Sequence, residues 1–260
     1  MRGKFLFLGT GASTGVPVIG CKCAVCSSSN PRNVRLRPSG LLEVGGMKIL
    51  IDAGPDYRQQ ALRAKIDRLD GLLLTHTHFD HIAGIDELRT YYIYQKAPLP
   101  CLLSEESLAE LKARYYYLFE PAGSGSSLPA QLDLKAAGGE SGDVDFLGVK
   151  VGYFKYTQGS MKVTGYRIGE FAYVSDIRGY DEAIFGWLAG VKVLVLSAIR
   201  EEASRTMFSV GEAVLFAKEA GAERTYLTHM NHEIDYDRVS RKLPSGVELA
   251  YDGLGVEFGI

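Results

Sequence analysis

Residues 72–86 read LLLTHTHFDHIAGID and hold most of the imidazole groups of the protein. His76, His78 and His81 are three of its five histidines, and the carboxylate of Asp80 lies among them. Side chains two positions apart in an extended strand point the same way, so His76 and His78 can bind one ion. Asp80 and His81 enter the next turn and face a neighbouring position. The spacing therefore predicts two adjacent metal sites, whereas polar residues that merely end a strand would account poorly for so long a motif.

A second set of possible ligands is the stretch GCKCAVC, which carries three of the four cysteines. Cys21, Cys23 and Cys26 are spaced closely enough for their thiolates to converge on one ion, and a tetrahedral site then needs a fourth ligand. Three free thiols in a polar loop are the alternative, which is less favourable because exposed, clustered thiols oxidise readily. Cys101, alone in the apolar LPCLLS, is expected to be a small buried residue.

Short apolar stretches bounded by Gly and Asp predict the strands that position these residues. One of them, GLLLT, runs directly into His76, so the motif sits at the carboxyl end of a strand, where α/β proteins bind ligands. Ser209 followed by Glu212 is a capping box that predicts the start of a helix. Blocks of strands followed by helices suggest two sheets packed face to face with helices outside. The predicted strands are 4–10, 39–45, 47–54, 69–76, 100–104, 144–154, 165–176, 191–198, 224–229 and 247–258, and the predicted helices are 56–66, 86–95, 106–119, 181–190, 209–221 and 237–243.

One compositional break interrupts this pattern. Residues 121–143 are rich in Gly, Ser and Ala and poor in large apolar groups, and we interpret them as a flexible, lid-like loop between two halves. At 260 residues the chain is long enough for one large core, so we expect a single domain over residues 1–260.

The composition bounds the class of protein and its partners. Hydrophobic residues at 46% and charged residues at 23% are typical of a soluble globular protein, and a net charge of −2 supplies no basic field to attract nucleic acid. The opening MRGKFLFLGTG is too short for a secretory signal, and no apolar stretch approaches the ~20 residues that span a bilayer. We therefore expect a cytoplasmic protein without a membrane or nucleic-acid partner, for which a homodimer is possible.

The HTHFDH stretch resembles the H-x-H-x-D-H signature of the metallo-β-lactamase superfamily, whose fold is an α/β, four-layer αββα sandwich with metals at one edge of the two sheets. Four other stretches resemble that family: FLGTGASTGVP its first strand and turn, ILIDAGPD its motif with Asp52, YVSDI the strand before the bridging carboxylate Asp176, and YLTHMNH the strand before the last ligand, His229. The resemblance implies two divalent ions, manganese or zinc. Their ligands would be His76, His78 and Asp176 at the first position, and Asp80, His81, Asp176 and His229 at the second.

The pairing of GTGASTGVPVIGCKCAVC with LTHMNH is more specific. It resembles the phosphodiesterase branch of the superfamily typified by the phosphoribosyl 1,2-cyclic phosphate phosphodiesterases called PhnP, in which such residues hold a structural zinc. His232 is also the one histidine left once the others are assigned, and it can complete a tetrahedron. We therefore predict a structural zinc in a loop at about residues 20–27, held by Cys21, Cys23, Cys26 and His232.

Three positions depart from the pattern of the family. Where related sequences have a ligand histidine, YTQGSMKVTGYR has Gln158, whose amide oxygen is a weaker donor than imidazole. After KVLVLSAIR, related sequences carry two histidines before FS, one of them a general acid, whereas EEASRTMFS has Ser204 and Met207 there. We therefore expect the first metal position, with Gln158 in it, to be weaker than the second.

We expect a metal-dependent hydrolase, namely a phosphodiesterase for a small (cyclic) phosphodiester, in which Asp80 and Asp176 act in catalysis. A hydroxide formed from a water shared by the two ions would attack phosphorus. Arg200 follows a strand end and is a candidate for binding phosphate, although a surface salt bridge is the commoner role of such a residue. A histidine that protonates the leaving group is typically worth ~10²–10⁴-fold. Its absence predicts slow turnover or an easier leaving group.

Two alternatives remain open at this point. A hydrolase of another ester, such as a lactone or a thioester, would share every ligand. A binding or regulatory protein with weakened or lost catalysis is suggested by Gln158, Ser204 and Met207. A tRNA 3′-end nuclease is less favoured, because no basic stretch is visible to contact phosphates.

Overall fold

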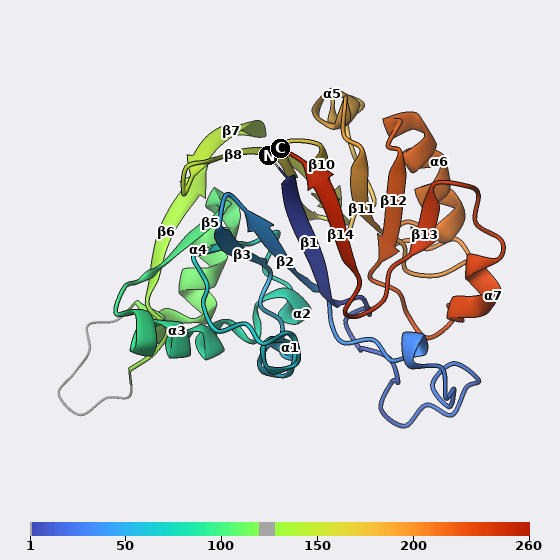
Figure 1. Ribbon diagram of the computed structural model, residues 1–260, viewed down its shortest axis with the longest axis horizontal. Helices are drawn as coiled ribbons and strands as arrows, with labels where there is room; N and C mark the ends of the chain where they lie inside the picture. Colours follow the sequence, from blue (N-terminus) through green and yellow to red (C-terminus); the bar gives the residue numbers. More distant parts are fainter. Residues whose placement is uncertain (1, 120–127) are drawn as a thin grey trace.

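The computed structural model describes residues 2–119 and 128–260, which form two mixed sheets of seven strands each (Figure 1). The first sheet contains, in spatial order, β14 (Gly255–Gly259), β1 (Arg2–Gly9), β2 (Ser39–Val44), β3 (Met47–Ile51), β4 (Gly71–Leu73), β5 (Leu99–Ser104) and β6 (Leu132–Ala137). The second contains β13 (Val247–Leu249), β12 (Arg224–Thr228), β11 (Val193–Ser197), β10 (Phe171–Val174), β9 (Met161–Ile168), β8 (Val149–Gln158) and β7 (Ser141–Phe146).

Helices cover the outer face of each sheet, which confirms the predicted αββα sandwich (Figure 1). The first sheet is covered by α1 (Tyr57–Ala64), α2 (Phe79–Ile82), α3 (Arg89–Gln95) and α4 (Glu105–Arg114). The second is covered by α5 (Ile184–Leu188), α6 (Val210–Ala220) and α7 (Tyr236–Ser240). Helix α6 begins with the capping box that the sequence predicts, since the side chains of Ser209 and Glu212 bond each other's backbone amides. Among the described residues, no helix is long and apolar enough to cross a bilayer.

The central core lies between the two sheets. Phe5 of β1 packs on Phe171 of β10, with ring centroids 5.0 Å apart, and both side chains are fully buried. The hydroxyl of Tyr166 on β9 crosses the interface and donates to the carbonyl of Leu74, just beyond β4, at 2.7 Å. Burial of this large apolar surface fixes one sheet on the other. Side chains from either sheet can therefore meet at a defined edge.

Parallel pairing brings several carboxyl ends of strands to that edge. In the first sheet, Ile51 of β3 lies opposite Leu73 of β4. In the second, Val174, Leu196 and Leu227 lie side by side on β10, β11 and β12. The polar residues that follow these positions therefore lie together at one edge of the sheets, where α/β proteins bind ligands.

The interpretation of residues 121–143 as a loop is wrong for its second half. Residues 120–127 lie outside the described part of the chain, and the lid-like role expected there falls partly on them. Residues 132–137 form β6 and residues 141–146 form β7, each at the edge of a different sheet. Alternate side chains of these edge strands face solvent, which explains why the segment lacks large apolar groups.

Three predicted strands are each two strands. Residues 144–154 and 165–176 each contain a turn, at Gly148 and Gly169, where a positive φ lets the chain reverse. Residues 247–258 divide into β13 and β14, which belong to different sheets. Alternation of apolar residues identifies strands but does not show where a strand leaves one sheet for the other.

Candidate metal centres

The loop after β4 carries the first group of potential metal ligands. The Nε2 atom of His76 lies 2.9 Å from Nδ1 of His78, and both rings approach the carboxylate of Asp176, which follows β10. The ligand atoms of these three residues lie within 4.8 Å of one another. His76 and Asp176 are buried, and His78 is half-buried. The two histidines point the same way, as their spacing in the sequence predicts.

The second group lies directly beside the first. It consists of Asp80, His81 and His229, all buried, whose ligand atoms also lie within 4.8 Å of one another. His229, which follows β12, places Nε2 at 3.2 Å from Oδ2 of Asp80. The Nε2 atom of His81 is 3.5 Å from the same oxygen. Residues from both sheets thus meet in one cluster.

Asp176 joins the two groups. Its Oδ2 lies 3.3 Å from Nε2 of His81, and its Oδ1 lies 3.2 Å from Nε2 of His229. A carboxylate that faces both groups can bridge two ions. We call these six side chains, together with Gln158, the histidine–aspartate cluster. Its two adjacent positions are formed by His76, His78, Asp80, His81, Gln158, Asp176 and His229.

Burial and charge set the protonation of these imidazoles. Burial lowers the pKa of His76 well below its usual range and also lowers the pKa of His78, which favours the neutral form that binds metal. Burial also opposes the charged form of His81, but the carboxylates of Asp176 and Asp52 outweigh it and raise the pKa of His81 well above its usual range. The buried carboxylates therefore need a positive charge, which a bound cation can supply in place of a proton.

Three buried atoms in this cluster have no hydrogen-bond partner among the described residues: Nε2 of His81, Oε1 of Gln158 and Nδ1 of His229. Buried polar atoms are rarely left unpaired, and an unpaired ligand atom beside carboxylates is what a metal site requires. Imidazole nitrogens and carboxylate oxygens suit zinc or manganese. The residues present therefore fit two divalent ions.

The sequence reasoning placed Asp52 only in a motif and missed its contact with the cluster. Its Oδ2 lies 2.7 Å from Nδ1 of His81. The backbone amide and the hydroxyl of Thr75 both donate to Asp52 at 2.8 Å. Such a carboxylate fixes the orientation of a ligand histidine and increases its basicity. An acid at the carboxyl end of β3, one strand from the histidine motif, was the signal that could have identified it.

Two cluster residues and the supporting Asp52 adopt a left-handed backbone conformation. The φ angle is 59° at Asp52, 56° at Asp176 and 61° at His229, each just after a strand. This conformation is uncommon for residues other than glycine and costs roughly 1–3 kcal/mol each. The surrounding sheets hold it in place, so the fold itself sets the direction of these side chains.

Helix α4 contacts the backbone between the first two histidines. The guanidinium of Arg114 donates to the carbonyl of Thr77 at 2.5 Å and to the carboxylate of Glu110 at 3.0 Å. The hydroxyl of Thr77 donates to the same carboxylate. This pair of charged residues fixes the peptide that lies between His76 and His78.

The cysteine cluster, made of Cys21, Cys23, Cys26 and His232, forms as the sequence predicts. The three sulfur atoms lie 3.2, 3.5 and 3.6 Å from Nδ1 of His232. Sulfur and nitrogen ligands of a tetrahedral zinc are separated by about 3.6 Å, so the geometry fits that ion. The backbone amide of Cys26 donates to the sulfur of Cys23 and lowers the pKa of this thiol to about 6, which favours the thiolate.

A buried arginine fixes this loop to the last motif. Arg35 donates to the carbonyls of Asn231 at 3.1 Å and Ile234 at 2.7 Å. It also donates to the side-chain oxygen of Asn33 at 3.0 Å. These bonds place His232 against the cysteines while His229, three residues earlier, faces the other cluster.

A cavity of about 380 Å³ opens onto the histidine–aspartate cluster. Gln158 lines it and donates from Nε2 to Oδ1 of Asp176 at 3.2 Å, so its amide contacts the bridging carboxylate. Met207 also lines it, whereas the side chain of Ser204 bonds the neighbouring Thr206. Arg200 is not among the lining residues and lies 3.6 Å from Glu233. The structure therefore does not bring Arg200 to the cavity.

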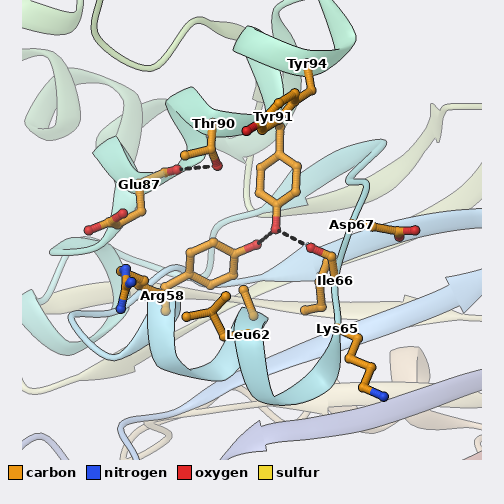
Figure 2. Close-up of a pocket in the computed structure, with 11 residues that line it drawn as sticks. Arg58, Leu62, Lys65, Ile66, Asp67, Glu87, Thr90, Tyr91 and Tyr94 are labelled. Carbon is orange, nitrogen blue, oxygen red and sulfur yellow. Dashed lines mark hydrogen bonds between the residues drawn. The ribbon is translucent and has the colours of Figure 1, made fainter.

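A larger cavity, of about 530 Å³, lies between α1 and α3 (Figure 2). Its inner wall carries the rings of Tyr57 and Tyr91, whose hydroxyls are 2.6 Å apart. Tyr91 donates onward to the carbonyl of Ile66 at 3.2 Å. No histidine or cysteine lines this cavity, so the side chains suited to metal chemistry belong to the smaller one.

The two sheets with their outer helices, and the ligand clusters beside them, are those of a protein with the metallo-β-lactamase fold. The chain belongs to the beta-lactamase superfamily, whose domain model matches residues 47–230. It is similar to a solved structure described as a new diphosphatase from the PhnP family, with a TM-score of 0.91 and 36% sequence identity over 99% of this chain and 98% of that one.

Two curated proteins show partial matches. An octanoyltransferase of Porphyromonas gingivalis is 32% identical over 257 residues, which cover 96% of this chain and 51% of that protein. A ribonuclease Z of Bradyrhizobium diazoefficiens is 47% identical over 64 residues, 24% of this chain and 21% of that protein. The chain thus spans about half the length of the first relative and about a fifth of the second.

Proposed function

We propose that this protein is a metal-dependent phosphodiesterase that acts on a small phosphodiester. The observation that carries the proposal is the contact of Asp176 with both groups of ligands beside a cavity of about 380 Å³. Proteins with which the chain shares sequence, a diphosphatase and a ribonuclease Z, are named for the hydrolysis of phosphate anhydrides and esters. Their names support phosphorus as the reacting centre.

In this proposal His76, His78 and Asp176 would hold one ion, with Gln158 as a weak further ligand. The second ion would be held by Asp80, His81, Asp176 and His229, and a structural zinc by the cysteine cluster. When bound, the two adjacent ions supply an activated water and neutralise charge on phosphate oxygens. The chain itself orients the ligands, through Asp52 on His81. Its cavity walls hold the substrate beside them.

A second candidate is a binding or regulatory protein with weakened or lost catalysis. It is favoured by Met207, an apolar side chain in the cavity wall where related sequences carry a histidine. Hydrolysis of another ester, such as a lactone or thioester, would use the same ligands.

One experiment separates these candidates. Protein purified without added metal is analysed by mass spectrometry for bound metals, and then assayed on bis(p-nitrophenyl) phosphate, a lactone and a thioester with manganese, zinc or nickel. We expect metal-dependent hydrolysis of the phosphodiester above the other two esters, and its loss in Asp80→Ala. If the metal positions are full and no ester is hydrolysed, the proposal of an enzyme is wrong and a binding protein is favoured.

A further inference from the structure

Among the described residues, every titratable side chain in the wall of the 380 Å³ cavity belongs to the histidine–aspartate cluster: His78, Asp80, Asp176 and His229. The other lining residues described in the structure have no acid that titrates near neutral pH. They are Ser13, Phe79, Gln158, Ile199, Thr206 and Met207. Once the cluster residues hold ions, this wall offers no proton to a departing group.

The arginines that follow nearby strands do not change this result. Arg178 lies 2.6 Å from Glu212 and Arg200 lies 3.6 Å from Glu233. Arg205, exposed beside Thr206, carries a guanidinium that stays protonated in proteins. These groups can attract an anion at the rim, but none can give up a proton to an alkoxide.

Departure without a proton is easy only for some oxygens. An alkoxide resembles hydroxide, whose conjugate acid, water, is a far weaker acid than a phenol. A phenolate has a conjugate acid of pKa about 10, and the second pKa of a phosphate ester is about 6. Without a general acid, a site hydrolyses esters of acidic leaving groups much faster than esters of weakly acidic ones. Protonation of the leaving oxygen by a general acid would reduce this difference in rate.

We propose that this site acts on phosphodiesters and phosphoanhydrides whose leaving oxygen departs unprotonated, that is, with an aryl, enol or phosphate leaving group, and works poorly on alkyl esters. This inference rests on the proposed function. In the step, the oxygen of water bonds to phosphorus and the bond from phosphorus to the leaving oxygen breaks. That oxygen keeps the electron pair, and the proton released by water passes to solvent. The apolar side chains of Phe79, Ile199 and Met207 suit an aryl group beside the reacting phosphorus.

The test compares kcat/KM for methyl p-nitrophenyl phosphate and methyl phenyl phosphate, since p-nitrophenol is the stronger acid. We expect the unmodified protein, loaded with manganese, to prefer the nitrophenyl ester by on the order of 100-fold. Met207→His places an imidazole in the same wall and should lower this ratio by on the order of ten-fold, mainly by accelerating the phenyl ester. Met207→Leu is the matched control, because it keeps an apolar wall without a proton donor and should retain the steep ratio.

The outcomes are distinct. If kcat/KM for the nitrophenyl ester exceeds that for the phenyl ester by less than about ten-fold in the unmodified protein, the leaving group is protonated in the site. That result overturns the inference but leaves the proposed phosphodiesterase activity intact. Equal changes of the ratio in Met207→His and Met207→Leu also overturn it. Hydrolysis of neither ester by protein with filled metal positions would instead overturn the proposed function.

Discussion

The cysteine cluster and the histidine–aspartate cluster are built in different ways. Three of the four ligands of the cysteine cluster come from one stretch of six residues, and all four are half-buried. The histidine–aspartate cluster collects its residues from the ends of strands in both sheets, and most of them are buried. The cysteine cluster is formed by one short loop together with His232. The other exists only after the two sheets have packed.

This difference determines what stabilises the geometry of each cluster. The loop at residues 20–27 contains neither strand nor helix, so an ion contributes directly to its order. In and beside the histidine–aspartate cluster, Asp176, His229 and the supporting Asp52 take left-handed conformations that the sheets impose. One cluster therefore depends on its metal for its geometry, while the fold sets the geometry of the other. The two clusters should then respond independently to substitution.

The largest expected effect is that of Asp80→Ala. This change removes a carboxylate near both His81 and His229, so the second position should lose at least ~100-fold in metal affinity, and phosphodiester hydrolysis should fall to background. The zinc of the cysteine cluster should remain, as measured by metal content. Asp133→Ala, at an exposed site in β6, is the control. Loss of zinc together with retained hydrolysis would mean that the two sites are wrongly assigned.

Cys23→Ser is the reciprocal change. It removes one of four thiolate or imidazole ligands, so the zinc should be lost and the free energy of unfolding should fall by about 2 kcal/mol or more, roughly 4–8 °C in Tm for a domain of this size. At temperatures below the Tm of this variant, the metals of the histidine–aspartate cluster should remain bound. Lys22→Ala, an exposed neighbour, should behave like the unmodified protein in metal content and Tm. If Cys23→Ser emptied both clusters, the independence inferred above would be wrong.

Asp52→Asn tests whether the fold orients His81. The amide lacks the negative charge and one acceptor, while asparagine still tolerates the φ of 59° at this position. We expect metal affinity at the second position to fall about 10- to 100-fold with little change in Tm. Titration of metal-free protein with zinc measures this effect. Unchanged affinity would show that His81 needs no support from Asp52.

Gln158→His tests the first position. An imidazole is a better donor to zinc than an amide oxygen, so this position should bind about 1–3 kcal/mol more tightly and be better occupied after purification. Hydrolysis should rise less than occupancy, because Met207 still provides no general acid. Gln158→Ala is the matched control, which loses the bond to Asp176 and should not gain metal. Full occupancy in the unmodified protein, with no gain from histidine, would contradict a weak first position.

Arg114→Ala should give the smallest effect. The guanidinium is about half exposed, with 47% of its side-chain surface accessible, so its contacts with Thr77 and Glu110 are worth less than about 1 kcal/mol. Metal affinity at the first position should fall a few-fold, and the cysteine cluster should be unaffected. Lys112→Ala on the same helix is the control. An equal loss in both variants would show that helix α4 acts only through general stability.

The two clusters also differ in how much of them the sequence reveals. The cysteines and the H-x-H-x-D-H motif are local patterns, so these residues could be predicted from the sequence itself, as could two sheets with helices outside. Asp176, Gln158 and His229 were expected only through the resemblance to the family. The contact of Asp52 with His81 could not, because it depends on register between β3 and β4 rather than on spacing along the chain. The sequence also did not show that Arg200 pairs with Glu233, or that residues 121–143 contain edge strands. Composition does not distinguish a loop from a strand with one solvated face.

The position of β1 has a consequence for synthesis of the protein. This strand lies between β2 and β14, and Arg2 lies opposite Gly259. The bonds to β2 can form once residues 39–44 have been made, since Lys4 pairs with Glu43. Those to β14 must wait until residues 255–259 have been made. Between these two events one side of a hydrophobic strand stays unpaired, at an edge that other strands can join, and the nascent chain is open to misassociation until β14 pairs.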